Sequence, residues 1–537
     1  MRYYTYLNCI IIVITCFLQS CRQHEAGADV AERDTTITIR NSVSELFFDS
    51  LALESFIAAH PMHDTLSNKL RSFYNSRNYQ FAWFYRDGMA DYASTFLALQ
   101  NNYISYSGDS TLYNASLQES VDSLQTDSLI KATDTRVLNT ELTLTYQFLR
   151  YTYRAYAGRG VNVQDLNWFI PRKKINPVDF LDSMLINKGK NLTAYEPVNR
   201  HYNLLKEQLL KYYEIEKKWP AEKVPGEKVY RKGDSSETIR SIKYRLHLLG
   251  DLPDYDSSGL FTEETEDAVK IFQRRHGLTE DGVAGKAFFT KINQPINEFT
   301  RRLLINMERM RWVPAEPAGD YMLVNIPEFR LHVFESGKLA WSMDVVVGST
   351  AHHTVIFHGD MKYVVFSPYW NVPPGITKNE IIPALRKNPN YLASHNMEKY
   401  AGGFRQKPGP NNALGLVKFL FPNSYNIYLH DTPAKSLFKE SKRAFSHGCI
   451  RLSDAKKLAT YLLRNDTTWT EEKITQAMNS RKEKYVTLEK TIPVFIGYFT
   501  AWVNSKGELN FRDDVYGHDG KMAGHLFASH TLASTTK

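Results

Sequence analysis

The spacing of apolar residues changes along this chain, and that change limits the possible folds more than any other feature. From residue 45 to about residue 222, apolar residues recur at i, i+3 and i+4, which is the period of an amphipathic helix. From residue 301 to about residue 498, the pattern alternates or is rich in β-branched and aromatic residues, which is typical of strands. The expected strands are residues 321–326, 330–335, 338–347, 363–367 and 425–430. The sequence therefore predicts a multidomain α+β protein with its helices first and a β-rich domain later.

Composition supports several packed domains. The chain has 537 residues, which allows three or four domains at about 150 residues each. Hydrophobic residues make up 43% and charged residues 23%, which excludes global disorder. Lys and Arg exceed Asp and Glu by 66 − 58 = 8, an excess too small for this length to indicate a nucleic-acid partner. Only four Cys are present, which excludes a disulfide scaffold.

The N-terminus predicts export. Arg2 precedes an apolar run over residues 7–18, which is too short to span a bilayer that needs about 20 residues. A charged start followed by a short apolar run is typical of a secretory signal. The run ends in Leu-Gln-Ser-Cys at Cys21, which resembles a lipobox and implies acylation of Cys21 and a lipid anchor in the cell envelope. An ordinary signal peptide and an uncleaved anchor are the alternatives. We assign residues 1–21 to the signal and the polar residues 22–44 to a flexible tether.

A compact helical unit is expected over residues 228–294, after a Pro/Gly/Lys-containing linker at residues 219–227. Thr262 is its expected helix N-cap, and acidic residues follow it in the first turn. The segments RKGDSSETI, RLHLLG, GLFTEET, AVKIFQRRHGL and DGVAG resemble the peptidoglycan-binding domain found in many cell-wall enzymes. The resemblance implies that this unit binds peptidoglycan; a structural spacer that has lost its binding groove is the alternative.

Cys449 is the only thiol expected in the mature globular chain, because the other three Cys lie in the signal region. A free Cys is commonly a buried core residue, so the residues around Cys449 must indicate whether it has a structural or a catalytic role. Gly448 allows a tight turn beside the thiol. If a strand starts here, Cys449 and Arg451 share one face, and Ile450 and Leu452 enter the core.

Two histidines could activate this thiol. At neutral pH a thiol with an ordinary pKa of about 8.5 is mostly protonated, so a nucleophilic Cys needs an adjacent base. His430 is one candidate, because the alternation in residues 425–430 places it opposite the apolar face. His447 is the other, because it lies on the glycine turn. The backbone N–H groups of Gly448 and Cys449 are candidate donors to an oxyanion.

His430-Asp431, a spacer of fifteen residues, and then Ser-His-Gly-Cys-Ile-Arg at residues 446–451 resemble the signature of the YkuD-type L,D-transpeptidases. Residues 306–312, 367–374, 429–433 and 511–517 are similar to the large YcbB-like subgroup. Members of that subgroup join a helical scaffold domain, a peptidoglycan-binding domain and a β-rich catalytic domain with a capping subdomain. The resemblance implies a scaffold domain at 45–222, a peptidoglycan-binding domain at 228–294, a catalytic domain at 301–498 with its cap at 371–413, and a C-terminal extension at 499–537.

The resemblance also implies roles for individual residues. Cys449 would be the nucleophile and His430 the base, with the Asp431 carbonyl orienting the imidazole. His447 and Gly448 would line the oxyanion region, and Arg451 would anchor the substrate or the pocket. Tyr369 and Trp370 would bind substrate at the start of the capping segment.

The implied reaction is acyl transfer through a covalent intermediate. The thiolate attacks the carbonyl of the third residue of a tetrapeptide stem, D-Ala leaves, and a side-chain amine of a second stem takes the acyl group to form a 3→3 cross-link. Acylation of the Cys by carbapenems is also implied. The expected partners are therefore peptidoglycan stem peptides and glycan, and no cofactor is expected.

Three alternatives remain. Water instead of an amine could resolve the thioester, which would make the protein an L,D-carboxypeptidase. A non-catalytic peptidoglycan-binding lipoprotein could keep the fold. A zinc site is the third alternative, but no H-E-x-x-H motif occurs, so we assign no metal ligands. Its candidate ligands would be His352, His353, His358, His430 and His447.

Overall fold

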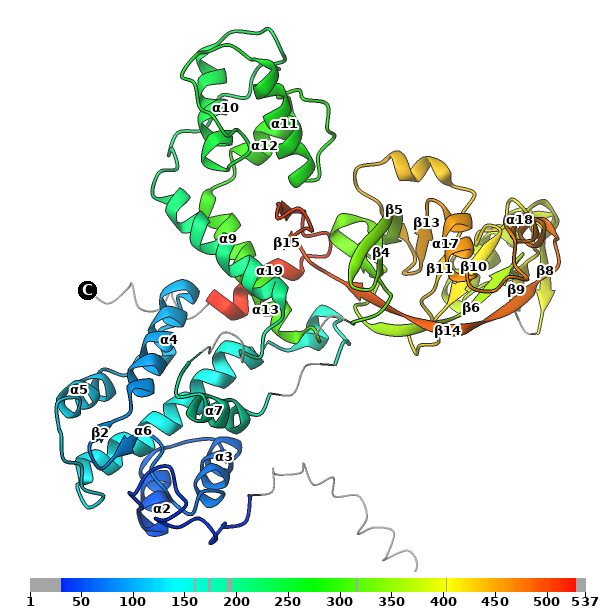
Figure 1. Cartoon of the computed structure of the whole chain (residues 1–537). Helices are drawn as coiled ribbons and strands as arrows, with labels where there is room; N and C mark the ends of the chain where they lie inside the picture. The colour runs from blue at the N-terminus through cyan, green and yellow to red at the C-terminus, as the bar shows by residue number, and fades with distance from the viewer. Residues whose placement is uncertain are drawn as a thin grey trace, which may run out of the picture. The chain divides into compact units, whose positions relative to one another are not determined.

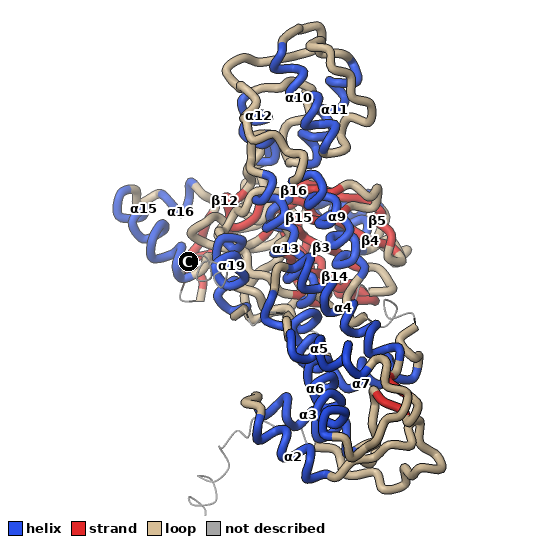
Figure 2. Tube along the Cα trace, turned by 90° about the vertical axis from the view of Figure 1, so that its left-hand side faces the viewer, coloured by secondary structure: helices blue, strands red, loops and turns tan. Residues whose placement is uncertain are grey.

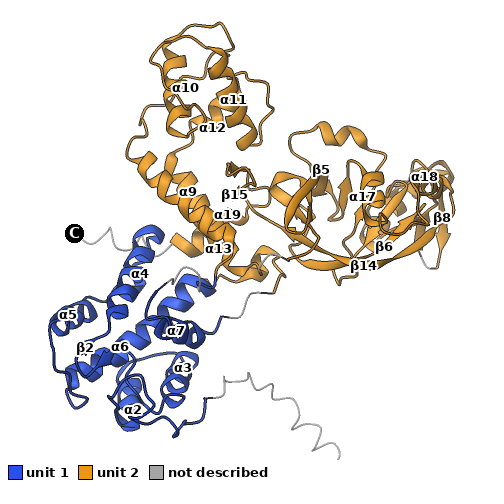
Figure 3. Cartoon of the chain, viewed as in Figure 1, with its two compact units in different colours: residues 1–157, 174–197 blue, residues 158–173, 198–537 orange. Residues whose placement is uncertain are grey.

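The computed structural model describes residues 30–158, 161–171, 175–190, 196–314, 317–401 and 403–527. The predicted signal peptide, Cys21 and the first residues of the predicted tether lie outside these described residues. The chain forms two compact units, shown in Figure 3: unit 1 comprises residues 1–157 and 174–197, and unit 2 comprises residues 158–173 and 198–537. Residues 158–173 and 198–222, which we assigned to the scaffold domain, therefore belong to the same unit as the catalytic domain.

Unit 1 is built mainly from helices (Figure 1). Four of these helices begin at polar caps: the side chains of Asp49, Asn114, Asp134 and Asn176 each accept a hydrogen bond from a backbone N–H of the first turn. Its regular elements are α2 (Ser50–Ala59), α3 (Asp64–Asn75), β1 (Phe84–Tyr85), β2 (Gly88–Met89), α4 (Asp91–Ser107), α5 (Ala115–Leu124), α6 (Thr135–Thr152) and α7 (Pro177–Ile186). None of the helices in the described part of the chain is long and apolar enough to cross a membrane.

A buried carboxylate organises the core of unit 1. Glu141 in α6 is fully buried and accepts hydrogen bonds from the N–H groups of Ala82 and Trp83, at 2.7 and 2.9 Å. The hydroxyl of Tyr74 donates a third bond at 2.9 Å. Burial raises the pKa of Glu141 to about 7, although these hydrogen bonds oppose the shift. Most of the dense aromatic residues of this region are buried, as expected for core residues.

The first part of unit 2 is also helical. Its helices are α9 (Arg200–Glu216), α10 (Glu237–Leu248), α11 (Glu263–Arg275), α12 (Lys286–Ile292) and α13 (Ile296–Trp312). The side chain of Thr262 caps α11, which confirms the predicted cap. The helices α10, α11 and α12 form the small unit expected at residues 228–294.

The predicted linker at residues 219–227 lies against this small unit. The guanidinium of Arg245 donates to the carbonyls of Pro220 and Glu222, and it stacks on Trp219 at 4.8 Å. Asn293 bonds both the N–H and the carbonyl of Val224, each at 2.8 Å. The linker is therefore held by side chains of the domain that follows it.

Nine strands of unit 2 form one sheet within the described residues; Figure 2 draws all strands in red. The order is β12-β5-β13-β11-β10-β6-β14-β3-β4, and β5 also pairs with β4, so the sheet closes on itself. Val324, Leu331, Val345 and Val364 are fully buried on its inner face. The strands are β3 (Tyr321–Asn325), β4 (Arg330–Glu335), β5 (Lys338–Gly348), β6 (His358–Phe366), β10 (Val417–Leu420), β11 (Leu429–His430), β12 (Ala444–Ser446), β13 (Ile450–Leu452) and β14 (Lys484–Gly497).

The segment between β6 and β10 forms a separate subdomain. A three-stranded sheet, β7-β9-β8, packs with short helices around Val372, Ile381 and Met397. Its elements are β7 (Trp370–Asn371), α14 (Pro374–Ile376), a π-helical turn (Thr377–Ile381), α15 (Ile382–Lys387), α16 (Tyr391–Ser394), β8 (Met397–Tyr400) and β9 (Gly403–Gln406). This segment coincides with the predicted cap at residues 371–413.

The remaining elements of unit 2 follow β13 and β14. They are α17 (Ala455–Leu462), α18 (Glu471–Asn479), β15 (Ala501–Val503), β16 (Leu509–Phe511) and α19 (His518–Phe527). The last three belong to the predicted C-terminal extension, and they fold as part of unit 2.

One predicted strand is largely wrong. Of residues 425–430, only Leu429–His430 form a strand, β11. Asn426 has φ +56°, a left-handed conformation that interrupts an extended chain. The side chain of Asn423 stabilises this turn by accepting hydrogen bonds from the N–H groups of Tyr425 and Ile427, at 3.0 and 3.2 Å. The strand pattern could not reveal this local hydrogen bonding.

Candidate active site

Two short parallel strands in the middle of the sheet position the candidate catalytic residues. In the register of β11 and β13, Leu429 lies opposite Ile450 and His430 lies opposite Arg451. Leu429, Ile450 and Leu452 are fully buried in the core. Because side chains alternate along a strand, Cys449 and Arg451 share the other face with His430. The prediction that Ile450 and Leu452 enter the core opposite Cys449 is confirmed.

Gly448 forms a sharp turn directly before Cys449. Its φ of +111° lies in the region that favours glycine. The Ser446 hydroxyl accepts the Gly448 N–H at 3.1 Å and donates to the Cys449 carbonyl at 2.5 Å. The Gly448 N–H is therefore occupied, which corrects its prediction as an oxyanion donor. The Cys449 N–H has no hydrogen-bond partner within the described residues, so it is the donor that this turn leaves available.

His430 is held in one tautomer. Its side chain is buried, and Nδ1 lies 2.5 Å from the Asp431 carbonyl oxygen, so Nδ1–H donates and Nε2 is left as the basic nitrogen. This is the carbonyl contact that the family resemblance implies. Burial lowers the pKa of His430 to about 4, and the positive charge of Arg451 contributes to the shift. His430 is therefore neutral at neutral pH, the form in which it can accept a proton.

The Cys449 thiol is partly exposed, and its sulfur lies 3.6 Å from the Asn426 carbonyl oxygen. Burial raises the pKa of Cys449, whereas hydrogen bonding from Tyr428 and the charge of Arg451 oppose the increase. Burial and the nearby thiol in turn raise the pKa of Tyr428. We did not assign Tyr428 to the site from the sequence, although the alternation that placed His430 on the polar face placed Tyr428 there too.

Arg451 and His447 lie beside the thiol but contact different groups. The Arg451 Nε is buried and has no hydrogen-bond partner among the described residues, and burial lowers the pKa of this side chain. The His447 side chain is about half exposed, with Nε2 3.4 Å from Glu380 Oε1 of the capping subdomain. Its ring also lies 4.7 Å from the ring of His352. The role of His447 in the oxyanion region therefore stays a prediction.

The two aromatic residues that we assigned to substrate binding pack within the capping subdomain. Trp370 packs against the cluster around Val372 and Met397. The Arg405 guanidinium lies 4.0 Å above the Tyr369 ring. Both side chains thus help to stabilise the subdomain, and their contact with substrate stays a prediction.

The histidines of the zinc alternative have other neighbours. His353 stacks on Tyr516 at 4.1 Å, and His358 lies 6.0 Å from Phe495. Within the described ranges, no group of three or more His, Cys, Asp or Glu side chains could hold a metal ion.

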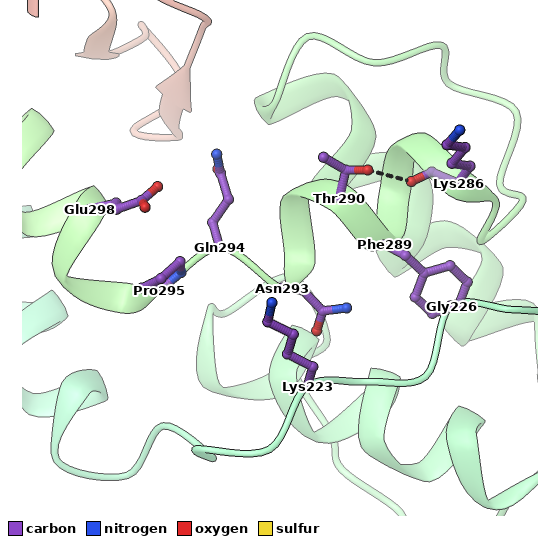
Figure 4. A pocket seen from close by; sticks show the side chains of 9 residues that line it. All are labelled: Lys223, Gly226, Lys286, Phe289, Thr290, Asn293, Gln294, Pro295 and Glu298. Carbon is purple, nitrogen blue, oxygen red and sulfur yellow. Dashed lines mark hydrogen bonds between the residues drawn. The ribbon is translucent and has the colours of Figure 1, made fainter. Parts of the chain in front are cut away.

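A separate pocket of about 520 Å³ lies at the edge of the small helical unit (Figure 4). Lys223 and Gly226 of the linker, Phe289 of α12 and Glu298 of α13 contribute to its lining. None of the candidate catalytic residues lines it.

Three family models match consecutive parts of the chain. Residues 319–494 match the L,D-transpeptidase catalytic domain (YkuD), and residues 68–209 match a scaffold domain. Residues 235–292 match the family described as "Putative peptidoglycan binding domain". A curated Haemophilus influenzae protein named "Putative L,D-transpeptidase" is 32% identical over 247 residues. That match covers 42% of this chain and 50% of the relative, so the chain spans half the length of the relative it matches.

Two solved L,D-transpeptidase structures were also matched. The protein from Xylanimonas cellulosilytica is 14% identical, covering 52% of this chain and 99% of that chain with a TM-score of 0.19. The protein from Stackebrandtia nassauensis is 16% identical, covering 52% and 98% with a TM-score of 0.22. Residues 319–494 thus match the L,D-transpeptidase catalytic domain (YkuD), and matches to a scaffold domain and a peptidoglycan-binding domain precede them, as the motif resemblance predicted.

Proposed function

We propose that this protein is a peptidoglycan L,D-transpeptidase that forms 3→3 cross-links through a Cys449 acyl-enzyme. The supporting observation is the parallel register of β11 and β13, because it sets Cys449, Arg451 and His430 on one face. The Asp431 carbonyl fixes the His430 tautomer, so that Nε2 can take a proton.

In the proposed reaction, His430 accepts the thiol proton as the sulfur attacks the carbonyl of the third stem residue. The Cys449 N–H donates a hydrogen bond to the oxyanion of the tetrahedral intermediate. Collapse of the intermediate forms the thioester, and the proton from His430 leaves with the amine of D-Ala. The side-chain amine of a second stem then attacks the thioester, forms the cross-link and releases the thiol.

The other domains would bring this site to its substrate. We propose that the helical unit at residues 228–294 binds peptidoglycan, which would raise the effective concentration of stem peptides near Cys449. We further propose export to the periplasm, with a lipid anchor at Cys21 in the cell envelope. Radiolabelled palmitate incorporation into the wild-type chain but not into the Cys21→Ser variant would test the anchor.

The activity is tested by incubating the chain with disaccharide-tetrapeptide and measuring product masses. We expect a cross-linked dimer together with free D-Ala, and no products from Cys449→Ala. Formation of tripeptide without dimer would show that the protein is an L,D-carboxypeptidase and not a transpeptidase. Residual dimer formation by Cys449→Ala would refute the catalytic assignment, and no products from a folded wild-type chain would support the non-catalytic binding protein.

A further inference from the structure

The peptide unit between Gly448 and Cys449 is restrained by a hydrogen bond to its carbonyl oxygen. The Thr354 hydroxyl donates to the Gly448 carbonyl oxygen at 2.7 Å. That carbonyl and the Cys449 N–H belong to the same trans peptide unit, so they point in opposite directions. Holding the carbonyl therefore sets the direction of the Cys449 N–H. Gly448 makes this restraint necessary, because a glycine peptide can rotate more freely than any other.

Thr354 is itself fixed by a residue from the end of the chain. Its hydroxyl accepts the Gly348 N–H at 2.9 Å, and its own N–H donates to the Tyr516 hydroxyl at 3.3 Å. The Tyr516 hydroxyl donates in turn to the Gly348 carbonyl at 2.7 Å. Thr354 is 1% exposed and Tyr516 is 7% exposed, so water does not readily replace these bonds.

Tyr516 lies in the Phe-Arg-Asp-Asp-Val-Tyr-Gly motif at residues 511–517, beyond the end of the match to the catalytic domain at residue 494. Its backbone N–H donates to the Tyr498 hydroxyl at 2.8 Å, and that hydroxyl donates to Asp514 at 2.6 Å. The ring of His353 stacks on the Tyr516 ring at 4.1 Å. The motif therefore delivers one rigidly placed hydroxyl to the loop behind the Cys449 turn.

We propose that Tyr516 is a positioning residue for catalysis, acting through Thr354 to aim the Cys449 N–H at the oxyanion. The C-terminal extension is then part of the catalytic unit. This inference rests on the proposed acyl-enzyme chemistry, because an oxyanion donor has a role only if an acyl group reaches Cys449.

Two reactions of the same sulfur separate positioning from general structural damage. Alkylation by iodoacetamide needs the thiol but no oxyanion donor, whereas acylation by a carbapenem passes through a tetrahedral oxyanion. Losing one oxyanion donor costs about 10²- to 10³-fold in rate, so misaligning one is expected to cost about 10- to 100-fold. We expect Tyr516→Phe, in the full chain, to slow carbapenem acylation by about 10- to 100-fold and to change the alkylation rate by less than about twofold.

The control is Tyr461→Phe, which removes the hydroxyl of another tyrosine that is 7% exposed in the same unit but outside the Thr354 network. We expect it to leave both rates unchanged. Thr354→Val should slow acylation like Tyr516→Phe, and Thr354→Ser, which keeps the hydroxyl, should restore the rate. Thermal unfolding of each variant shows whether it folds. If a Thr354 variant fails to fold, the comparison of Tyr516→Phe with the wild type decides the inference.

Normal acylation by a folded Tyr516→Phe variant would overturn the inference and leave the proposed function intact. Equal slowing of acylation and alkylation would also overturn it, because the hydroxyl would then act only through general stability. If the folded wild-type chain forms no carbapenem adduct, the proposed function and this inference fall together.

Discussion

The charge state of the Cys449–His430 pair in the free enzyme is a direct test of the site. Burial lowers the pKa of His430 to about 4 and raises the pKa of Cys449. Both shifts oppose moving the proton from the thiol to the imidazole. Lowering the His430 pKa from 6.5 to about 4 alone opposes this transfer by about 3 kcal/mol, at 1.36 kcal/mol for each pKa unit. The neutral thiol–imidazole pair is therefore favoured at pH 7, and the thiolate is a minor species before substrate binds.

Iodoacetamide alkylation of Cys449, measured by mass spectrometry against pH, is the assay. We expect the rate to rise with pH up to and beyond about pH 9, without a step between about pH 5 and pH 8. Ultraviolet difference absorbance between the wild type and Cys449→Ala should show no thiolate at pH 7. Both proteins contain the same three N-terminal cysteines, so the contribution of these cysteines cancels in the difference.

A thiolate that titrates near pH 5–6, and that disappears in His430→Asn, would refute this reasoning. Such a result would mean that a thiolate–imidazolium pair forms before substrate binds, as in other cysteine enzymes. His430 would then not be the neutral base that its burial indicates.

Three further predictions concern stability. The pKa values of His430 and His518 are lowered to about 4 and about 3, so the folded state binds fewer protons than the unfolded state. The contribution of these two histidines to the free energy of unfolding of unit 2 should be fully present above about pH 6.5 and should decrease as pH falls toward 4. Denaturant unfolding at several pH values measures this change. Gly448→Ala should lower the free energy of unfolding by about 1–3 kcal/mol, because alanine is strained at the φ of +111° that Gly448 adopts. The substitution should also slow acylation. An unchanged thermal midpoint would argue against a strained turn. Glu141→Gln can accept only one of the two backbone N–H bonds from Ala82 and Trp83, so unit 1 should lose about 1–3 kcal/mol. Because the Glu141 pKa is raised to about 7, its contribution is lost as pH rises from 4.5 to 7, and the Gln variant should lack that pH dependence when unfolding is followed at both limits.

Local patterns determined much of the architecture. The cap at Thr262, the strands around residues 330–335 and 338–347, and the burial of Ile450 and Leu452 follow from periodicity and from side chains close in sequence. The Ser-His-Gly-Cys-Ile-Arg motif was sufficient to identify the catalytic domain family. Such features are readable because each depends on contacts within a few residues.

The tertiary structure decided which groups around Cys449 are free to act. Only the tertiary structure shows that Tyr428 lies beside the thiol. Thr354 and Tyr516 are 162 residues apart, yet they meet behind the catalytic turn. The periodicity of a chain reports which face of an element is apolar, but it carries no information about which distant hydroxyl satisfies a buried carbonyl or N–H group. Those pairings are set by sheet closure and by the requirement that buried polar groups find partners.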